Sequence, residues 1–209
     1  HRKGSNGLMR QAAENRFNRE ETLGKCFECL VSSGLENTSI RNFSLATGLN
    51  SSSLYYWFRD KDEIVLEATL FGLKSIIDDL FTQAYGYLND LDTLFVRIPR
   101  AIDAYKKHFK LVYQVLVSPK YGARLKDATS ELSAAYDSYG MVLADRLNCD
   151  YDILCPFVHL FISAATNYVL WEDEAIAEKQ YKEIYQGINI IVIHNKQHGG
   201  NENGAEQHA

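Results

Sequence analysis

Apolar side chains recur at three- and four-residue steps along most of the chain, which is the period of an amphipathic helix. The first such stripe lies within residues 18–33, where Asn18 and Glu21 are placed as in a capping box and Gly34 is a natural stop. No stretch shows the strict alternation of a half-buried strand. The pattern therefore predicts an all-α protein.

Further helices are predicted between polar breaks along the rest of the chain. Pro99 is expected to kink or divide the segment 91–117, and a break is expected near Gly140 in the segment 121–147. The expected helical segments after the first are 38 or 39 to 47, 51–58, 60–88, 91–117, 121–147, 153–171 and 174–194.

Composition changes this picture little, because 46% hydrophobic and 23% charged residues are ordinary for a globular protein of 209 residues. The segment 1–17 is expected to be a flexible N-terminal arm. The segment 195–209 is polar and rich in Gly, so we expect a disordered tail there. No signal peptide is apparent, which favours a cytoplasmic protein.

The net charge of −5 argues at first against a nucleic-acid partner. It is unevenly distributed, however: residues 1–64 carry nine basic and eight acidic side chains, and the remainder carries 13 basic and 19 acidic ones. The acidity therefore belongs to the C-terminal part, and the N-terminal part can lie against phosphates.

The sequence gives little support to a catalytic, redox or metal-binding function. Cys26 and Cys29 form a CxxC, but they share an apolar helical stripe and lack a second ligand pair for zinc, so buried packing is expected with redox sensing as the alternative. Cys149 and Cys155 suggest no disulfide framework. No metal-ligand cluster, phosphate loop or catalytic motif is apparent, so we expect no cofactor, no metal and no enzymatic activity.

The segment 153–171 has no charged residue, yet both of its flanks are acidic and it contains Pro156, His159 and Asn167. These features disfavour a membrane span. A helix that is apolar all round is also expected between a core and a partner subunit.

The most informative segment is Ile40–Phe58, which reads IRNFSLATGLNSSSLYYWF. Two short helices separated by Gly48, with Phe43, Leu54 and Trp57 at locking positions, satisfy the requirements of a helix-turn-helix. Three serines stand at the start of the second helix, where free backbone N–H groups favour a phosphate.

This segment resembles the DNA-binding domain of TetR-family transcriptional regulators over about 47 residues, from Arg19 to Val65. The resemblance rests on Gly34, Ser39, the turn 48–51, the run 54–58 and Lys61-Asp62-Glu63-Ile64. Ser44 and Thr47 depart from the family pattern, but both are small. The resemblance implies a helix-turn-helix DNA-binding domain at 18–64 and an effector-binding and dimerisation domain at 65–194.

By resemblance, Tyr55 and Lys61 would contact phosphates, and the serines would lie at the major groove. The implied DNA-binding residues are Thr38, Arg41, Ser51, Ser52, Ser53, Tyr55, Tyr56 and Lys61. For Trp57 and Phe58 we favour packing, for Tyr56 packing and DNA contact remain open, and Arg41 could equally be a solvated helix residue.

The resemblance also implies a ligand-responsive repressor that binds a palindromic double-stranded DNA operator as a homodimer and is released by a small-molecule effector. Aromatic walls with a few polar groups suit such a ligand. Our candidates for the ligand pocket are Tyr105, His108, Phe109, Tyr113, Tyr136, Tyr139 and Asn167, although packing is an alternative for each. We guess an uncharged or weakly polar, partly aromatic ligand.

The two closing helices would pack against their copies in the homodimer. The candidate interface residues are Phe161, Ile162, Ala165, Ile188, Ile191 and Val192. Two other functions stay open at this point, an all-helical enzyme and a helical interaction protein with a vestigial helix-turn-helix.

Overall fold

The computed structural model describes residues 19–198, without the side chains of residues 130–136 and 195–198. Every regular element in this part of the chain is a helix, so the predicted all-α class is confirmed. The chain forms two compact units, and the long helices α4 (Lys61–Gly86) and α7 (Gly122–Leu147) contribute to both.

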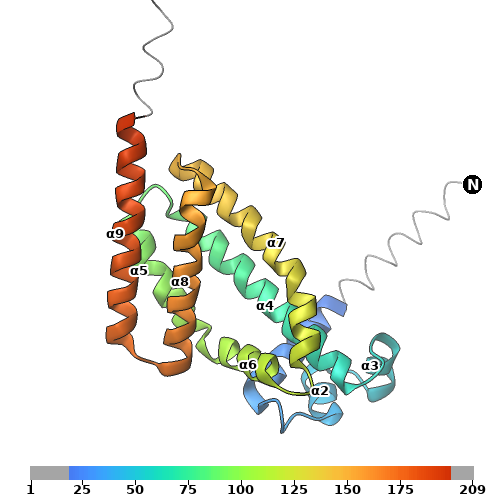
Figure 1. Cartoon of the computed structure of the whole chain (residues 1–209). Helices are drawn as coiled ribbons and strands as arrows, with labels where there is room; N and C mark the ends of the chain where they lie inside the picture. The colour runs from blue at the N-terminus through green and yellow to red at the C-terminus, as the bar shows by residue number, and fades with distance from the viewer. Residues whose placement is uncertain (1–18, 199–209) are drawn as a thin grey trace, which may run out of the picture. The chain divides into compact units, whose positions relative to one another are not determined.

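The first unit contains the helix at residues 19–33, α2 (Ile40–Thr47), α3 (Ser51–Trp57), the start of α4, α6 (Lys106–Val117) and the start of α7 (Figure 1). Its core collects the apolar stripe of each helix, because burying that face removes it from water. The fully buried side chains include Leu30, Phe43, Leu54, Phe58, Ile64, Val115 and Leu125.

The second unit contains the end of α4, α5 (Leu91–Ala104), the rest of α7, α8 (Tyr151–Trp171) and α9 (Glu174–His198). Figure 1 shows α8 and α9 side by side, and their facing residues form one apolar cluster. The cluster contains Leu154, Ala164, Tyr168, Tyr181 and Ile184. Gly187 permits the close approach, since a Cβ there would come within 2.2 Å of the Phe157 ring.

The helical run 91–117 is divided at Tyr105, not at Pro99 as the sequence suggested. Pro99 lies inside α5, where it removes one hydrogen bond without ending the helix. The chain leaves the helix at Tyr105, whose N–H bonds to Ile102 O and whose hydroxyl donates to Asp79 at 2.9 Å. The break in the helical run at Tyr105 therefore coincides with a hydrogen bond to a residue that is distant in the sequence.

Other boundaries differ modestly from the predictions. The helix α7 continues through Gly140, which lies against the Tyr151 ring. The helix α9 extends to His198, so the first four residues of the predicted tail are helical. The rest of that tail, the N-terminal arm and the expected cap Asn18 lie outside the described residues. The first break between the two compact units falls after Ile76, and the predicted boundary at 64/65 between a DNA-binding and an effector-binding domain stays a prediction.

By length and composition alone, α8 could cross a membrane. One of its faces is nevertheless buried against protein, and the hydroxyl of Tyr168 on that face donates to Asp103 at 2.7 Å. Lys106 also lies over the Tyr168 ring, 4.5 Å from its centroid. These contacts join one face of α8 to the rest of its unit, and the absence of a membrane partner stays a prediction.

Candidate nucleic-acid interface

The helices α2 and α3 form a helix-turn-helix whose ends are capped by local hydrogen bonds. Ser39 begins α2 in a capping box with Asn42. Gly48 ends α2 with φ of 73°, a left-handed conformation that costs a residue with a Cβ more than it costs glycine. Asn50 then caps α3 by accepting from the N–H of Ser53 at 2.8 Å. The turn is therefore specified by Gly48 and Asn50, while Ser39 and Asn42 fix the start of α2.

The two helices are locked by the predicted apolar residues. Phe43, Leu54 and Phe58, which follows α3, are fully buried. Trp57 is half-buried, and the Arg19 guanidinium lies 5.0 Å from the Phe58 ring centroid. Packing was the favoured role of Phe58, and its burial agrees with that interpretation. This packing fixes the orientation of α3 and therefore of the side chains on its outer face.

Most of the predicted DNA-binding side chains lie on accessible surface. Ser51, Ser52 and Arg41 are exposed, Tyr55 is 48% exposed and Tyr56 is 79% exposed. Ser53 is half-buried, as is Lys61 at the start of α4. The high exposure of Tyr56 disfavours packing, the alternative left open by its sequence position.

Thr38 is a correction to the sequence-based prediction. Only 1% of it is exposed, and its hydroxyl donates to Gly34 O at 2.6 Å. The hydrogen bond satisfies a carbonyl at the end of the first helix and leaves no surface for a phosphate. Conversely, sequence reasoning gave no role to Leu45, an apolar residue of α2 that is 75% exposed. Its position on the outer face of a short helix was the available signal.

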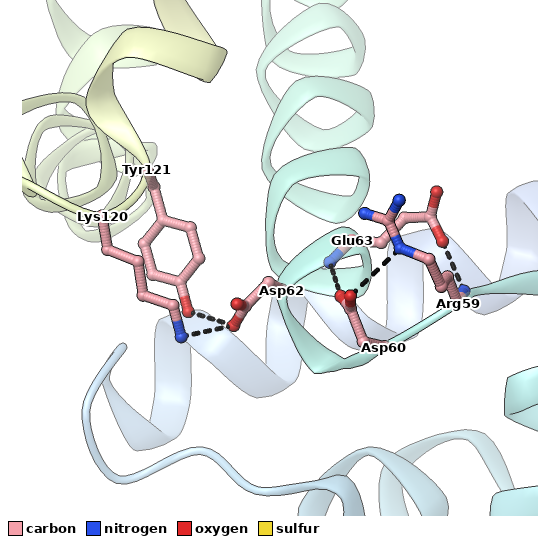
Figure 2. A network of polar contacts seen from close by, with 6 residues as sticks. All are labelled: Arg59, Asp60, Asp62, Glu63, Lys120 and Tyr121. Atoms are coloured by element: carbon pink, nitrogen blue, oxygen red, sulfur yellow. Dashed lines mark hydrogen bonds and ion pairs between the residues drawn. The ribbon is translucent and has the colours of Figure 1, made fainter.

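A polar network of Arg59, Asp60 and Glu63 organises the start of α4 (Figure 2). Asp60 accepts from the N–H of Glu63 at 2.9 Å and from Arg59 Nε at 3.2 Å, and Glu63 accepts from the N–H of Arg59. The N–H of Glu63 lowers the pKa of Asp60. Asp60 is therefore anionic at neutral pH, as suits the positive end of the α4 dipole.

On its other side, Asp62 receives two donors from the segment before α7, as Figure 2 shows. Lys120 Nζ lies 2.7 Å and Tyr121 Oη 2.9 Å from the same Oδ1 atom. The Lys120 hydrogen bond lowers the pKa of Asp62, and Asp62 in turn raises that of Lys120. Burial raises the pKa of Tyr121, and its hydrogen bond to Asp62 adds to the rise. These bonds fix the first turn of α4 and with it the backbone of Lys61.

The predicted ligand-pocket residues divide between the two units. His108, Phe109 and Tyr113 belong to the first unit, where His108 Nε2 lies 3.0 Å from Glu28 Oε1. Tyr105, Tyr139 and Asn167 belong to the second, and Asn167 is exposed. The side chain of Tyr136 lies outside the described ones. A single pocket formed by these residues thus stays a prediction.

The predicted dimer-interface residues need a partial correction. Ile188 and Val192 are buried in the core of their own chain, and Phe161 packs on Tyr181 with ring centroids 5.0 Å apart. Ala165 and Ile191 are half-buried, and Ile162 is 40% exposed. Both faces of α9 carry isoleucines, so composition alone did not distinguish the inner face from the outer. The exposed ones are Ile176, Ile190 and Ile193.

The four cysteines are free thiols that differ in burial. Cys26 is fully buried and Cys29 nearly so, as expected for packing residues. Burial raises the pKa of Cys26 to about 12, with a contribution from Cys29. Within residues 19–198 no group of three or more His, Cys, Asp or Glu side chains could hold a metal ion.

Comparison with solved structures identifies the fold. The chain is similar to a protein from Rhodococcus sp. described as a TetR-family transcriptional regulator, with a TM-score of 0.56 at 14% identity over 84% of this chain and 99% of the other. A TetR-family transcription regulator from Marinobacter aquaeolei VT8 matches with a TM-score of 0.46 at 19% identity, covering 84% and 97%. No protein-family model matches the sequence, and curated proteins gave no match either.

Proposed function

We propose that this chain, which has the fold of TetR-family transcriptional regulators, is a sequence-specific DNA-binding repressor. One observation carries the proposal: α3 presents Ser51, Ser52 and Tyr56 outward while Phe43 and Leu54 hold the helix from within. A short, rigid helix with hydroxyl groups at its N-terminus suits the major groove.

In this proposal the residues divide into those that position the protein and those that read sequence. Lys61, Arg41 and Tyr55 contact phosphates, which supply affinity but no sequence information. Ser51, Ser52, Ser53 and Tyr56 reach base edges or their neighbouring backbone. Because residues 1–64 carry few basic side chains, each subunit neutralises few phosphates, and its non-specific affinity for DNA is modest.

The active form is a homodimer, because a single short recognition helix reads few base pairs and a two-fold pair reads a palindrome. The exposed apolar residues of α8 and α9 support the interface. Leu160 and Leu170 on α8 are about half exposed, and Ile190 on α9 is 68% exposed. Large apolar side chains exposed on neighbouring helices are typical of an association site.

The proposed role also includes release from the operator by a small-molecule effector held in the second unit. Binding regulates only if the ligand distinguishes the DNA-competent state of the dimer from the incompetent one. Repression, cytoplasmic location and the absence of enzymatic activity belong to the same proposal.

Selection from a random pool of double-stranded DNA, followed by binding measurements against salt concentration, tests this function. We expect an enriched palindrome. Lys61→Ala should weaken binding to all sequences and reduce the salt slope by about one, whereas Ser52→Ala should change sequence preference. The matched control is Lys74→Ala, which removes the same charge from an exposed position later in α4.

Two outcomes would contradict the proposal. Selection without enrichment would show that the helix-turn-helix is vestigial, which returns the protein to the class of helical interaction proteins or enzymes. Equal salt slopes for Lys61→Ala and Lys74→Ala would remove Lys61 from the phosphate contacts.

The dimer is tested separately by light scattering during size-exclusion chromatography. Ile190→Asp should convert the dimer to a monomer, because a charge would be buried in an apolar interface. Met141→Asp is the matched control, since Met141 is an exposed apolar residue on α7. A monomeric wild-type chain would contradict the dimer.

A further inference from the structure

Three aromatic rings and a carboxylate meet between α4 and α7 in the second unit. The rings of Phe81 and Tyr139 are stacked with centroids 4.2 Å apart, and the Tyr85 ring lies 6.2 Å from Tyr139. The hydroxyl of Tyr139 donates to Asp78 Oδ1. We call Asp78, Phe81, Tyr85 and Tyr139 the aromatic–carboxylate cluster. The first three share one face of α4, because they are three and four residues apart.

A second pair of the same type adjoins the cluster on α4. Asp79 Oδ2 accepts from the Tyr105 hydroxyl at 2.9 Å and from Gln83 Nε2 at 2.6 Å. Two of the tyrosines that sequence alone indicated as ligand contacts are thus hydrogen-bonded to consecutive aspartates. Sequence analysis had assigned no role to either aspartate.

Asp78 and Asp79 differ from three other aspartates of the described chain in their ion pairing. Within the described side chains neither Asp78 nor Asp79 forms an ion pair, whereas Asp60, Asp62 and Asp103 each pair with Lys or Arg. A partly buried carboxylate gains from an opposite charge nearby, because it has lost part of its hydration. The adjacent carboxylates are therefore poised for a cation.

The aromatic rings beside the carboxylates add a second attraction for the same kind of ligand. Ring faces carry negative charge density and bind ammonium groups within about 6 Å of their centroids. All four members of the cluster are half-buried, so they provide apolar walls that still reach the surface. Carboxylate oxygens and ring faces together repel an anion and favour an organic cation over a neutral molecule of equal shape.

We propose that the aromatic–carboxylate cluster binds the ammonium group of an aromatic or alkyl organic cation, and that this cation is the effector. That the cation acts as the effector rests on the proposed function, but its binding to the cluster does not. It also replaces the uncharged ligand guessed from sequence, since that guess took no account of Asp78 and Asp79.

A pair of isosteric probes tests the proposal. The (4-hydroxyphenyl)trimethylammonium ion and 4-tert-butylphenol have nearly the same shape and differ in charge. Calorimetric titration of the full chain should show the cation binding at least about tenfold more tightly than the neutral probe. Equal or tighter binding of the neutral probe, or saturation by neither, overturns the proposal.

Variants then locate the site. Asp78→Asn should abolish the tenfold preference, whereas Tyr139→Phe should keep it, because the ring remains and Asp78 loses a competing donor. If the Tyr139 hydroxyl were needed instead to hold the cluster together, Tyr139→Phe would lose cation binding. The matched control is Asp137→Asn, which removes an exposed carboxylate that accepts from Tyr151 at 2.7 Å. Loss of preference in the control equal to that in Asp78→Asn overturns the assignment.

DNA release is measured separately by fluorescence anisotropy with the selected palindrome. Release by the cation, and not by the neutral probe, supports its role as effector. Cation binding that depends on Asp78 without any selected DNA would leave the site intact and contradict the proposed function. Specific DNA binding with no preference for the cation would overturn this inference alone.

Discussion

Lys120 Nζ lies 2.7 Å from Asp62 Oδ1, so a residue just before α7 holds the second residue of α4. Tyr121 donates to the same oxygen from the neighbouring position. Both bonds act beside Lys61, the proposed phosphate contact. Lys120 and Tyr121, which are distant in the sequence, thereby help to fix the position of Lys61 at the start of α4.

The first prediction concerns Asp62→Asn. The folded chain lowers the pKa of Asp62 below 3.8, so the carboxylate adds stability above that pH and loses it as the pH falls through the lowered value. Since the Lys120 side chain is 62% exposed, we expect a loss at pH 7 of at most about 1 kcal/mol.

Urea unfolding at neutral and acidic pH checks this prediction. The variant should lose less stability than the wild type on acidification below about pH 4, because one of the groups that must be protonated is gone. The control is Asp152→Asn, which removes an exposed carboxylate at the start of α8. Parallel pH curves for the wild type and Asp62→Asn would contradict the linkage.

The second prediction compares two glycines that have open space around a notional Cβ. Gly48→Ala should destabilise the chain by about 1 kcal/mol, because φ of 73° is unfavourable for alanine. Gly86→Ala has no such strain and should stabilise it by up to about 1 kcal/mol by reducing the entropy of the unfolded chain. Thermal unfolding distinguishes the two, and a shift of the same sign in both would refute the argument.

The third prediction concerns Ser44, whose hydroxyl oxygen is buried without a hydrogen-bond partner among the described residues. An unsatisfied buried polar group costs about 1–3 kcal/mol, so Ser44→Ala should raise the free energy of unfolding by an amount of that order. Ser39→Ala is the contrasting variant, since it removes the cap of α2 and should lower stability by about 1 kcal/mol. A destabilised Ser44→Ala would indicate a partner for the hydroxyl.

The fourth prediction concerns thiol reactivity. Burial raises the pKa of both Cys26 and Cys29, so neither offers thiolate at neutral pH. We expect a thiol-specific reagent to modify these two only as the chain unfolds. Cys149 and Cys155 should react first because they are only half-buried, although burial raises the pKa of Cys149 as well. Rapid modification of Cys26 in the native chain would revive the redox alternative.

Sequence reasoning located α2 and α3 well because their signals are local. Ser39, Gly48 and Asn50 each act through hydrogen bonds or backbone angles within a few residues of themselves. Spacing also identified Phe43 and Leu54 as buried, since a short helix has one apolar face.

The predictions were wrong where two neighbouring residues, or two faces of one helix, have the same chemical character in the sequence. Thr38 and Ser39 are adjacent hydroxyl residues before α2, yet Ser39 caps the helix and Thr38 is buried. On α9, apolar residues occupy more than one face, so periodicity did not show that Ile188 and Val192 point into the chain and Ile190 outward.

The sequence by itself therefore determined the all-helical class, the capped turn between α2 and α3, and the uneven charge that permits a DNA-reading N-terminal part. Only the tertiary structure decided which face of α9 is free, where the run 91–117 breaks, and which side chains surround Asp62 and Asp78. The physical reason is the range of the interactions: caps and backbone angles depend on near neighbours, whereas burial and ion pairing depend on residues that folding alone brings together.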